Sequence, residues 1–238
     1  MTPLRLTWRL STPMATSGYP IHLDDLVAFA KTRMELRMAG YGEEGLGSSI
    51  RDLARVLPLE REERPEGRVW KASALVPADN IQVTHGMRFW TKKTDPFDYA
   101  SRFDQGHLAI RTKRENMKPY ALKIDTQRGL LKNGFKFFTV KHVPVLQAWC
   151  VGDEEALREL LDPACGSPLM WIGARGRSGL GRISAFEMVR DEAAFDLWQR
   201  RTLPWAYEGA TELELATEPP YWEPANRRLA WIDPSLIM

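Results

Sequence analysis

The spacing of apolar residues separates the first part of the chain into a strand and a helix. Residues 4–10, LRLTWRL, alternate strictly between apolar and polar side chains, which predicts a half-buried strand. Residues 21–38 change to helical spacing, and the apolar face we expect to be buried consists of Leu23, Leu26, Val27, Ala30 and Met34. Asp24 and Asp25 fall in the first turn, where carboxylates suit the positive end of the helix dipole.

Four further elements follow from the same patterns. Residues 69–77 and 182–189 are predicted as strands, and residues 143–152 are apolar and β-forming enough for a central strand. Residues 153–161, DEEALRELL, predict a short helix that Asp153 caps. Without the segment between the second and third strands, the order is βαββαβ. This order predicts an α+β fold of the ferredoxin-like kind, as in RNA-recognition motifs.

Charge then divides the chain into parts. Residues 88–141 carry thirteen Lys or Arg and five Asp or Glu, whereas the formal net charge of the chain is only +2. We expect a ferredoxin-like body at residues 1–79 and 142–190 and a basic, thumb-like insertion at 80–141. An irregular, Pro- and Trp-rich tail at 191–238 is expected to wrap the body. A basic segment in a nearly neutral protein indicates either a local contact with a polyanion or a solvated, lysine-rich insertion.

A glycine-rich segment, IGARGRSGLGRI at residues 172–183, is the strongest candidate for chemistry. It lacks the Lys-Ser/Thr pair of a nucleotide-binding P-loop, and it precedes a predicted strand where a nucleotide motif requires a helix. Two interpretations remain: a tight structural turn, or a loop that holds a nucleic-acid backbone. The second predicts RNA contacts from Arg175, Gly176, Arg177, Ser178, Gly179 and Arg182.

The basic insertion interleaves cations with aromatic residues, a composition typical of proteins that bind unstacked RNA bases. Trp90 and Phe137 are expected in the insertion's own small core rather than on RNA. The cations predicted to contact RNA are Arg88, Lys92, Lys93, Arg111, Lys113, Arg114, Lys118, Lys132 and Lys136.

The glycine-rich segment resembles the C-terminal glycine-rich loop of the RAMP superfamily of CRISPR proteins. Together with LQAWCVGDEEALRELL at residues 146–161, which precedes it, and with LRLTWRLSTPM and YPIHLDDLVAFA near the N-terminus, it is similar to the guide-RNA 5′-handle-binding subunit of type IV CRISPR effector complexes. The resemblance covers residues 4–30 and 145–190.

The resemblance implies a non-catalytic RNA-binding subunit that caps one end of a DNA-targeting complex. Its implied partners are the guide RNA (crRNA) 5′ handle, the repeated backbone subunit and the large subunit. Target DNA and the helicase associated with the system are further implied partners. No cofactor and no metal are expected, since Asp24 and Asp25 are adjacent and point in different directions on a helix.

Two other functions stay open at this stage. A metal-independent RAMP endoribonuclease that processes precursor guide RNA needs a general acid–base pair, and His22 is the one serious candidate. A protein scaffold without RNA contact is the other. The chain has two cysteines, no apolar run long enough for a membrane span and no apolar signal core, so we expect a cytoplasmic protein without membrane contact.

Overall fold

The structure is a computed structural model, and it describes residues 1–16, 18–38, 52–106, 126–127 and 132–237. The chain forms two compact units. The first comprises Met1–Gly86 and Val140–Met238, and the second comprises Met87–Thr139.

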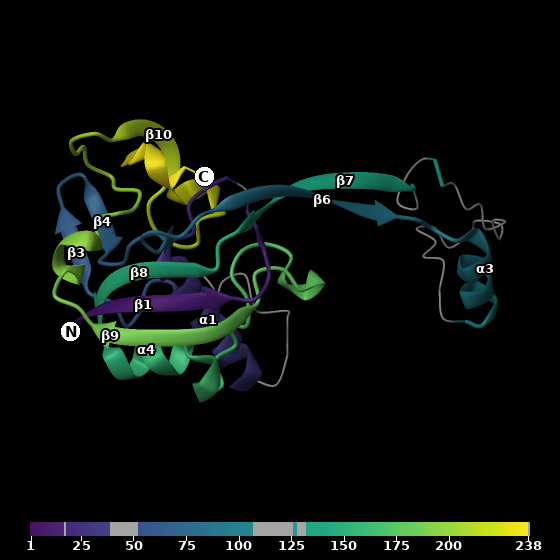
Figure 1. The fold of residues 1–238 in the computed structure, drawn as a ribbon, viewed down its shortest axis with the longest axis horizontal. Helices are drawn as coiled ribbons and strands as arrows, with labels where there is room; N and C mark the ends of the chain where they lie inside the picture. The colour runs from purple at the N-terminus through teal and green to yellow at the C-terminus, as the bar shows by residue number, and fades with distance from the viewer. Residues whose placement is uncertain (17, 39–51, 107–125, 128–131, 238) are drawn as a thin grey trace, which may run out of the picture. The chain divides into compact units, whose positions relative to one another are not determined.

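The first unit is built on a four-stranded sheet in the order β5-β8-β1-β9. Its strands are β1 (Thr2–Leu10), β5 (Val76–Pro77), β8 (Val145–Gly152) and β9 (Ile183–Arg190), and β8, β1 and β9 lie side by side in Figure 1. All neighbours are antiparallel, with Leu6 opposite Ala148 on one side and Met188 on the other. This order and direction are those of a ferredoxin-like sheet, so the α+β class predicted from the pattern is confirmed.

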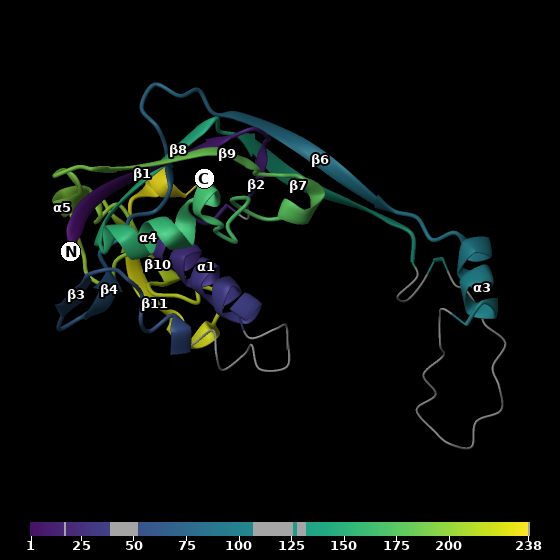
Figure 2. The ribbon, with the colours of Figure 1, turned by 90° about the horizontal axis from the view of Figure 1, so that it is seen from below.

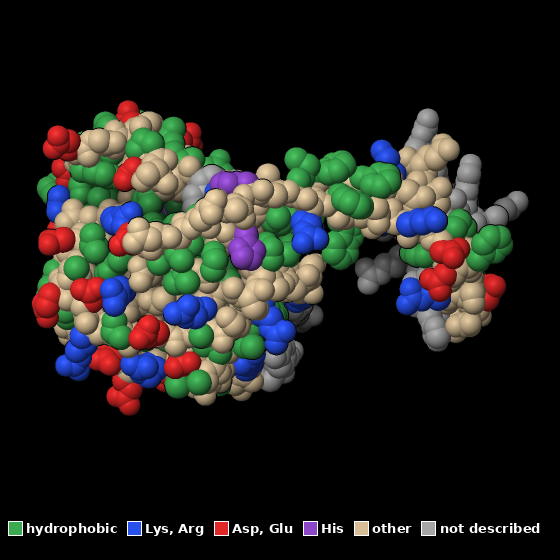
Figure 3. Space-filling view, viewed as in Figure 1, with side chains coloured by type: hydrophobic (Ala, Val, Ile, Leu, Met, Phe, Trp, Pro, Cys, Tyr) green, Lys and Arg blue, Asp and Glu red, His purple; other side chains and the backbone are tan. Residues whose placement is uncertain are grey.

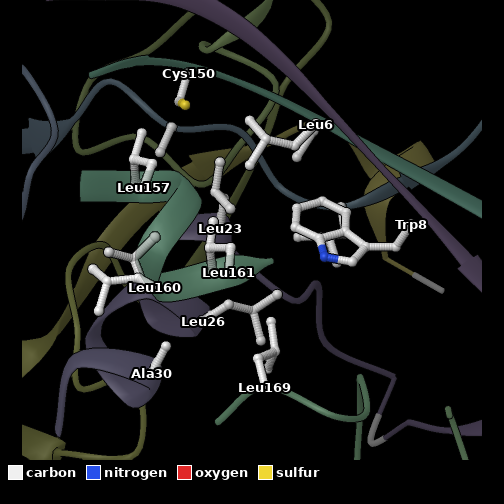
Figure 4. Close-up of a cluster of buried hydrophobic side chains, with 14 of the residues drawn as sticks. Leu6, Trp8, Leu23, Leu26, Ala30, Cys150, Leu157, Leu160, Leu161 and Leu169 are labelled. Carbon is white, nitrogen blue, oxygen red and sulfur yellow. The ribbon is translucent and has the colours of Figure 1, made fainter. Parts of the chain in front are cut away.

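Two helices cover one face of this sheet, α1 (Leu23–Met38) and α4 (Glu154–Leu161) (Figure 2). Asp153 caps α4 as predicted, because its carboxylate accepts hydrogen bonds from the backbone N–H groups of Glu155 and Ala156 at 3.0 and 3.1 Å. The largest hydrophobic core lies between sheet and helices. Figure 4 shows part of it, with Leu6 and Trp8 of β1 facing leucines of α1 and α4.

The strand predicted at residues 69–77 is divided in two. Its first part belongs to β4 (Gly67–Trp70), which pairs with β3 (Arg61–Arg64) rather than with the main sheet. Its second part is β5, and between the two parts Ala72 forms an isolated bridge to Cys150 and Ala74 forms one to His22. The strand β3 belongs to the charged segment that precedes β4. Its pairing with β4 is supported by Arg61, whose guanidinium lies 4.0 Å from the centroid of the Trp70 ring and covers that aromatic face.

The C-terminal segment, predicted as irregular, contains ordered elements. These are α5 (Ala194–Leu197) and a hairpin of β10 (Thr211–Ala216) with β11 (Arg227–Ile232). Alternation explains β11, since Ala230 and Ile232 are buried, Trp231 between them is partly exposed and Leu229 before them is exposed. Ile232 joins Trp149 and Val76 in a second hydrophobic cluster. Short 3-10 helices lie at Pro163–Cys165, Gly176–Ser178, Pro224–Asn226 and Pro234–Leu236.

The basic insertion contains a ribbon of two long strands, β6 (Thr84–Lys92) and β7 (Gly134–His142), and the helix α3 (Pro96–Asp104). The short strand β2 (Met14–Ala15) pairs with β7 where the ribbon leaves the first unit. The expectation that Trp90 and Phe137 form a core is wrong, because these side chains are 50% and 68% exposed. A two-stranded ribbon has no second layer among the described residues to cover them, and Figure 3 shows hydrophobic side chains exposed along it.

Candidate nucleic-acid interface

The glycine-rich segment is a loop held in place by the chain that leaves β1. Its ends are joined by a bridge between Trp171 and Arg182. Inside it, the backbone N–H of Gly181 donates to the carbonyl of Pro13 and that of Ala174 donates to the carbonyl of Ala15, both at 2.8 Å. The loop therefore has a defined shape that is fixed by backbone hydrogen bonds.

Three of its glycines are required by close packing. A Cβ at Gly173 would lie 2.6 Å from the carbonyl oxygen of Ala15. A Cβ at Gly176 would lie 1.9 Å from Cδ1 of Trp171, whose ring rests against the loop. A Cβ at Gly181 would lie 1.9 Å from the carbonyl oxygen of Ile172, and its φ of +68° also favours glycine. Gly179 differs, since its φ is +79° but nothing lies within 4 Å of the position a Cβ would take.

The polar side chains that were predicted on this loop point into solvent. Arg175, Arg177, Ser178 and Arg182 are all exposed, and the hydrogen bonds that shape the loop are made by backbone atoms. Both interpretations of the loop are thus compatible: the glycines form a tight turn, and that turn presents arginines at its surface.

A large cavity of about 920 Å³ lies beside this loop. Arg175, Gly176 and Arg177 line it, whereas Ser178, Gly179 and Arg182 are not among its lining residues. Three more arginines reach the same cavity from other parts of the chain: Arg33 and Arg37 of α1 and Arg227 at the start of β11. The structure therefore brings five guanidinium groups from three segments around one cavity.

Exposed aromatic side chains line the same cavity. They come from four segments and are Tyr19, Phe29, Trp171 and Trp222. Neither these residues nor the three additional arginines were predicted from the sequence. One signal was present: Phe29, Arg33 and Arg37 recur every four residues and so share one helix face, where the Arg33 guanidinium lies 5.4 Å from the Phe29 centroid.

A fully buried ion pair lies beneath the cavity. Nη2 of Arg201 donates to Oδ2 of Asp24 at 3.0 Å, and both side chains are inaccessible to solvent. Arg201 also donates to the carbonyls of Trp70 and Ala72 and to that of Thr217. Burial raises the pKa of Asp24, and the charge of Arg201 opposes that shift. Asp24 is therefore a structural anchor rather than a dipole-compensating surface residue.

His22 is in the same buried network and is among the residues that line the cavity. The residue is 3% exposed, and its ring stacks on that of Tyr221 at a centroid distance of 4.3 Å. Its Nε2 accepts a hydrogen bond from the backbone N–H of Thr202. Burial and the nearby Arg201 charge hold the pKa of His22 well below its usual value. A neutral imidazole with Nε2 engaged by the backbone is poorly placed for proton transfer to a substrate.

Asp25 lines the cavity next to this network and is partly exposed. Burial and the adjacent Asp24 raise the pKa of Asp25 to about 7, and a hydrogen bond from the backbone of Tyr221 opposes the shift. The cavity thus contains one carboxyl group with an unusual ionisation among several arginines.

Of the cations of the insertion that were predicted to contact RNA, some lie among the residues that the structure describes and the rest lie outside them. Arg88, Lys92, Lys93, Lys132 and Lys136 are exposed in the second unit. Arg111, Lys113, Arg114 and Lys118 lie outside the described residues.

The described part of the chain has neither a cluster of metal-ligating side chains nor a helix that could span a membrane. In these ranges no group of three or more His, Cys, Asp or Glu side chains could hold a metal ion. None of the helices described is both long and apolar enough to cross a membrane.

Comparison with known proteins shows the family of this chain. The model of the family described as CRISPR type IV associated protein Csf3 matches residues 2–233. A search of curated proteins finds no match. The family match spans nearly the whole chain and includes the strand, the helix and the glycine-rich loop on which the resemblance to type IV CRISPR proteins rested. The chain belongs to the Csf3 family of CRISPR type IV associated proteins.

Proposed function

We propose that this protein is a non-catalytic subunit of a type IV CRISPR effector complex and binds the 5′ handle of the guide RNA. In this role it caps one end of the complex, contacts the repeated backbone subunit and the large subunit, and works in the cytoplasm. Target DNA and the helicase of the system are further partners of the complex.

One observation carries the proposal: arginines from α1, the glycine loop and β11 surround a single cavity that exposed aromatic residues also line. Arginine forks bind phosphate oxygens, and aromatic faces stack on unpaired bases. A single-stranded RNA offers both groups in every nucleotide. A protein scaffold without RNA contact has no need for five arginines at one concave surface.

The ribbon supplies a second surface that suits an assembly subunit. Its exposed apolar side chains include Met87, Phe89, Phe135 and Phe137, with the Phe89 and Phe137 rings 6.4 Å apart. Exposed clusters of this kind mark contacts with other macromolecules. Arg88, Lys92, Lys93, Lys132 and Lys136 add positive charge there, which suits RNA held against a neighbouring subunit.

Binding of a fluorescent repeat RNA, measured against salt concentration, tests the proposal. We expect log K to fall with log salt, with a slope of about −0.7 for each phosphate neutralised on a single strand. Arg175→Ala combined with Arg177→Ala should make this slope shallower by about 1.4 if both residues neutralise phosphates. Arg158→Ala is the matched control, since Arg158 lies on α4 and pairs with Glu154. A flat salt response in the unmodified protein would favour the scaffold function.

The alternative function, processing of precursor guide RNA, is tested by incubating the purified protein with repeat RNA without divalent metal. We expect intact RNA, and the buried, backbone-bonded state of His22 supports this expectation. Specific cleavage that disappears in His22→Ala would replace the binding role with the nuclease role.

A further inference from the structure

The cavity beside the glycine loop has the features of a site for one nucleobase as well as for phosphates. Its volume of about 920 Å³ falls within the usual range of small-ligand sites, about 300–1,000 Å³. Tyr19, Phe29 and Trp222 supply aromatic surface on which a flat ring can stack. The five arginines account for binding of phosphates, and an arginine fork can also bind O6 and N7 of guanine, but arginines have no acceptor for the N–H donors of a base.

Phosphate binding does not explain the acidic residues of the cavity, Glu214 and Asp25, and Asp25 is the more buried of the two. A carboxylate repels a polyanion, and this one lies beside a second carboxyl group, Asp24, and is held by a hydrogen bond from the backbone of Tyr221. Such a group becomes favourable when a ligand brings N–H donors to it, because an ionised carboxylate offers only acceptors.

The bases differ in what they offer to a carboxylate. Guanine has two adjacent donors, N1–H and the N2 amino group, which match the two oxygens of one carboxylate. Adenine and cytosine place a ring nitrogen acceptor beside their amino group, and uracil has its one N–H between two carbonyls. Each of these acceptors would face a carboxylate oxygen unfavourably. Guanine is therefore the base that this carboxylate selects.

We propose that the cavity receives one unstacked guanine of the bound RNA, with the Asp25 carboxylate accepting from N1–H and the N2 amino group. The inference rests on the proposed function, because it assigns a base to the RNA that the arginines hold. Glu214 also lines the cavity, but its side chain is exposed, so water competes for its oxygens. The partly buried Asp25 is the better reader of a base.

Fluorescence polarisation of the full chain with short RNAs tests this at pH 8, where Asp25 is ionised. The probes are a ten-nucleotide uridine RNA and the same RNA with one central guanosine, adenosine or inosine. We expect guanosine to improve binding about tenfold over adenosine. Inosine, which lacks only the N2 amino group, should fall between them. Asp25→Asn should abolish the preference for guanosine, and it should tighten rather than weaken binding of the uridine RNA because it removes a carboxylate that repels the polyanion. Glu214→Gln, which removes the other carboxylate of the cavity, should keep the preference.

The outcomes separate the two proposals. If the probes bind with the salt dependence described above but guanosine, inosine and adenosine bind equally, the guanine site is wrong and RNA binding stands. If the preference is lost in Glu214→Gln rather than in Asp25→Asn, the assignment to Asp25 is wrong. If the complete repeat RNA and every probe fail to bind, the proposed function itself fails. The comparison of guanosine with inosine alters only the RNA, so equal binding of the two overturns the contact with the N2 amino group even if Asp25→Asn does not fold. In that case the preference retained or lost in Glu214→Gln decides which carboxylate makes the contact.

Discussion

Arg201 is the residue on which the inner part of the candidate site depends. Its guanidinium joins Asp24 of α1 to the carbonyls of Trp70 and Thr217, so three distant segments meet at one buried cation. The hydroxyl group of Tyr221, which lines the cavity, donates to Asp24 at 3.0 Å. The position of the cavity wall is thus linked to an ion pair that solvent does not reach.

Replacing Arg201 tests this link. Arg201→Met should lower the free energy of unfolding by about 3–5 kcal/mol, because Asp24 is then left as an uncompensated buried charge. Urea unfolding measures the change. Adding Asp24→Asn to Arg201→Met should restore part of the stability, since the unpaired charge is removed. A single variant as stable as the parent protein would contradict a structural role for the pair.

The raised pKa of Asp25 predicts that the stability of the parent protein and that of Asp25→Asn depend differently on pH. The pKa of Asp25 is about 7 in the folded chain, above its ordinary value, so the folded state holds the proton more tightly. This contribution is present at low pH and is lost as pH rises through about 7. Asp25→Asn removes it, so the variant should gain stability relative to the parent between pH 4 and 7, by at most roughly 1.4 kcal/mol per pH unit.

Unfolding of both proteins at several pH values measures this difference. The lowered pKa of His22 acts in the opposite direction, since stability is lost as pH falls below its ordinary value, but His22 is present in both proteins. Asp24 and Arg201 are likewise shared. Parallel curves for the parent protein and Asp25→Asn would contradict the raised pKa.

Sequence patterns predicted the loop arginines as site residues, but they did not predict the buried contacts of Asp24 with Arg201 and Tyr221. Arg175 and Arg177 were predicted because arginines and glycines stand together in one short segment. Asp24 and Arg201 are 177 positions apart, and Asp24 and Tyr221 are 197 positions apart. No local spacing links such residues, so a single sequence contains no signal for their contact.

At the scale of elements, the segments that were predicted well are those with a long, uniform period. The strand β1 alternates over its whole length, and α4 combines an apolar face with a capping aspartate. The segment at 69–77 failed because it changes partners midway, from β3 to β8, which its own pattern does not reveal. Tertiary pairing decides such short strands.

The glycine loop gives a prediction at this scale. Gly181→Ala should destabilise the protein by about 3 kcal/mol or more, because its Cβ would collide with the carbonyl of Ile172. Gly179→Ala is the matched control, since it meets only backbone strain and should cost about 1–2 kcal/mol. Thermal unfolding of the two variants measures the difference. Equal losses would mean that the loop can move aside at Gly181.

At the scale of the whole molecule, the three hydrophobic clusters lie entirely in Met1–Gly86 and Val140–Met238. The excess of Lys and Arg over Asp and Glu distinguishes residues 80–141 from the rest of the chain, and it predicted that they form a separate insertion. Its exposed aromatic residues could not be recognised as exposed, since an aromatic in a strand is more often buried than not.

Removal of the ribbon should therefore leave a folded body. In a variant with residues 87–139 replaced by Asn-Gly, a two-residue hairpin turn joins Gly86 to Val140, whose side chain lies 3.4 Å from the Cβ position of Gly86. We expect cooperative thermal unfolding close to that of the full chain and an unchanged preference for guanosine. RNA affinity should fall, because the cations of the ribbon are absent. Loss of cooperative unfolding would show that the body needs the ribbon.

The wall of the cavity also sets an order of events during synthesis. The glycine loop is complete once residue 183 has been made, but Arg201, Tyr221 and Arg227, which anchor or line the opposite side, come later in the chain. A nascent chain that ends before them has the loop arginines and Asp25 but lacks Arg201, Tyr221 and Trp222, which hold or line the cavity. We therefore expect this site to select among bases only in chains that have been synthesised past Arg227.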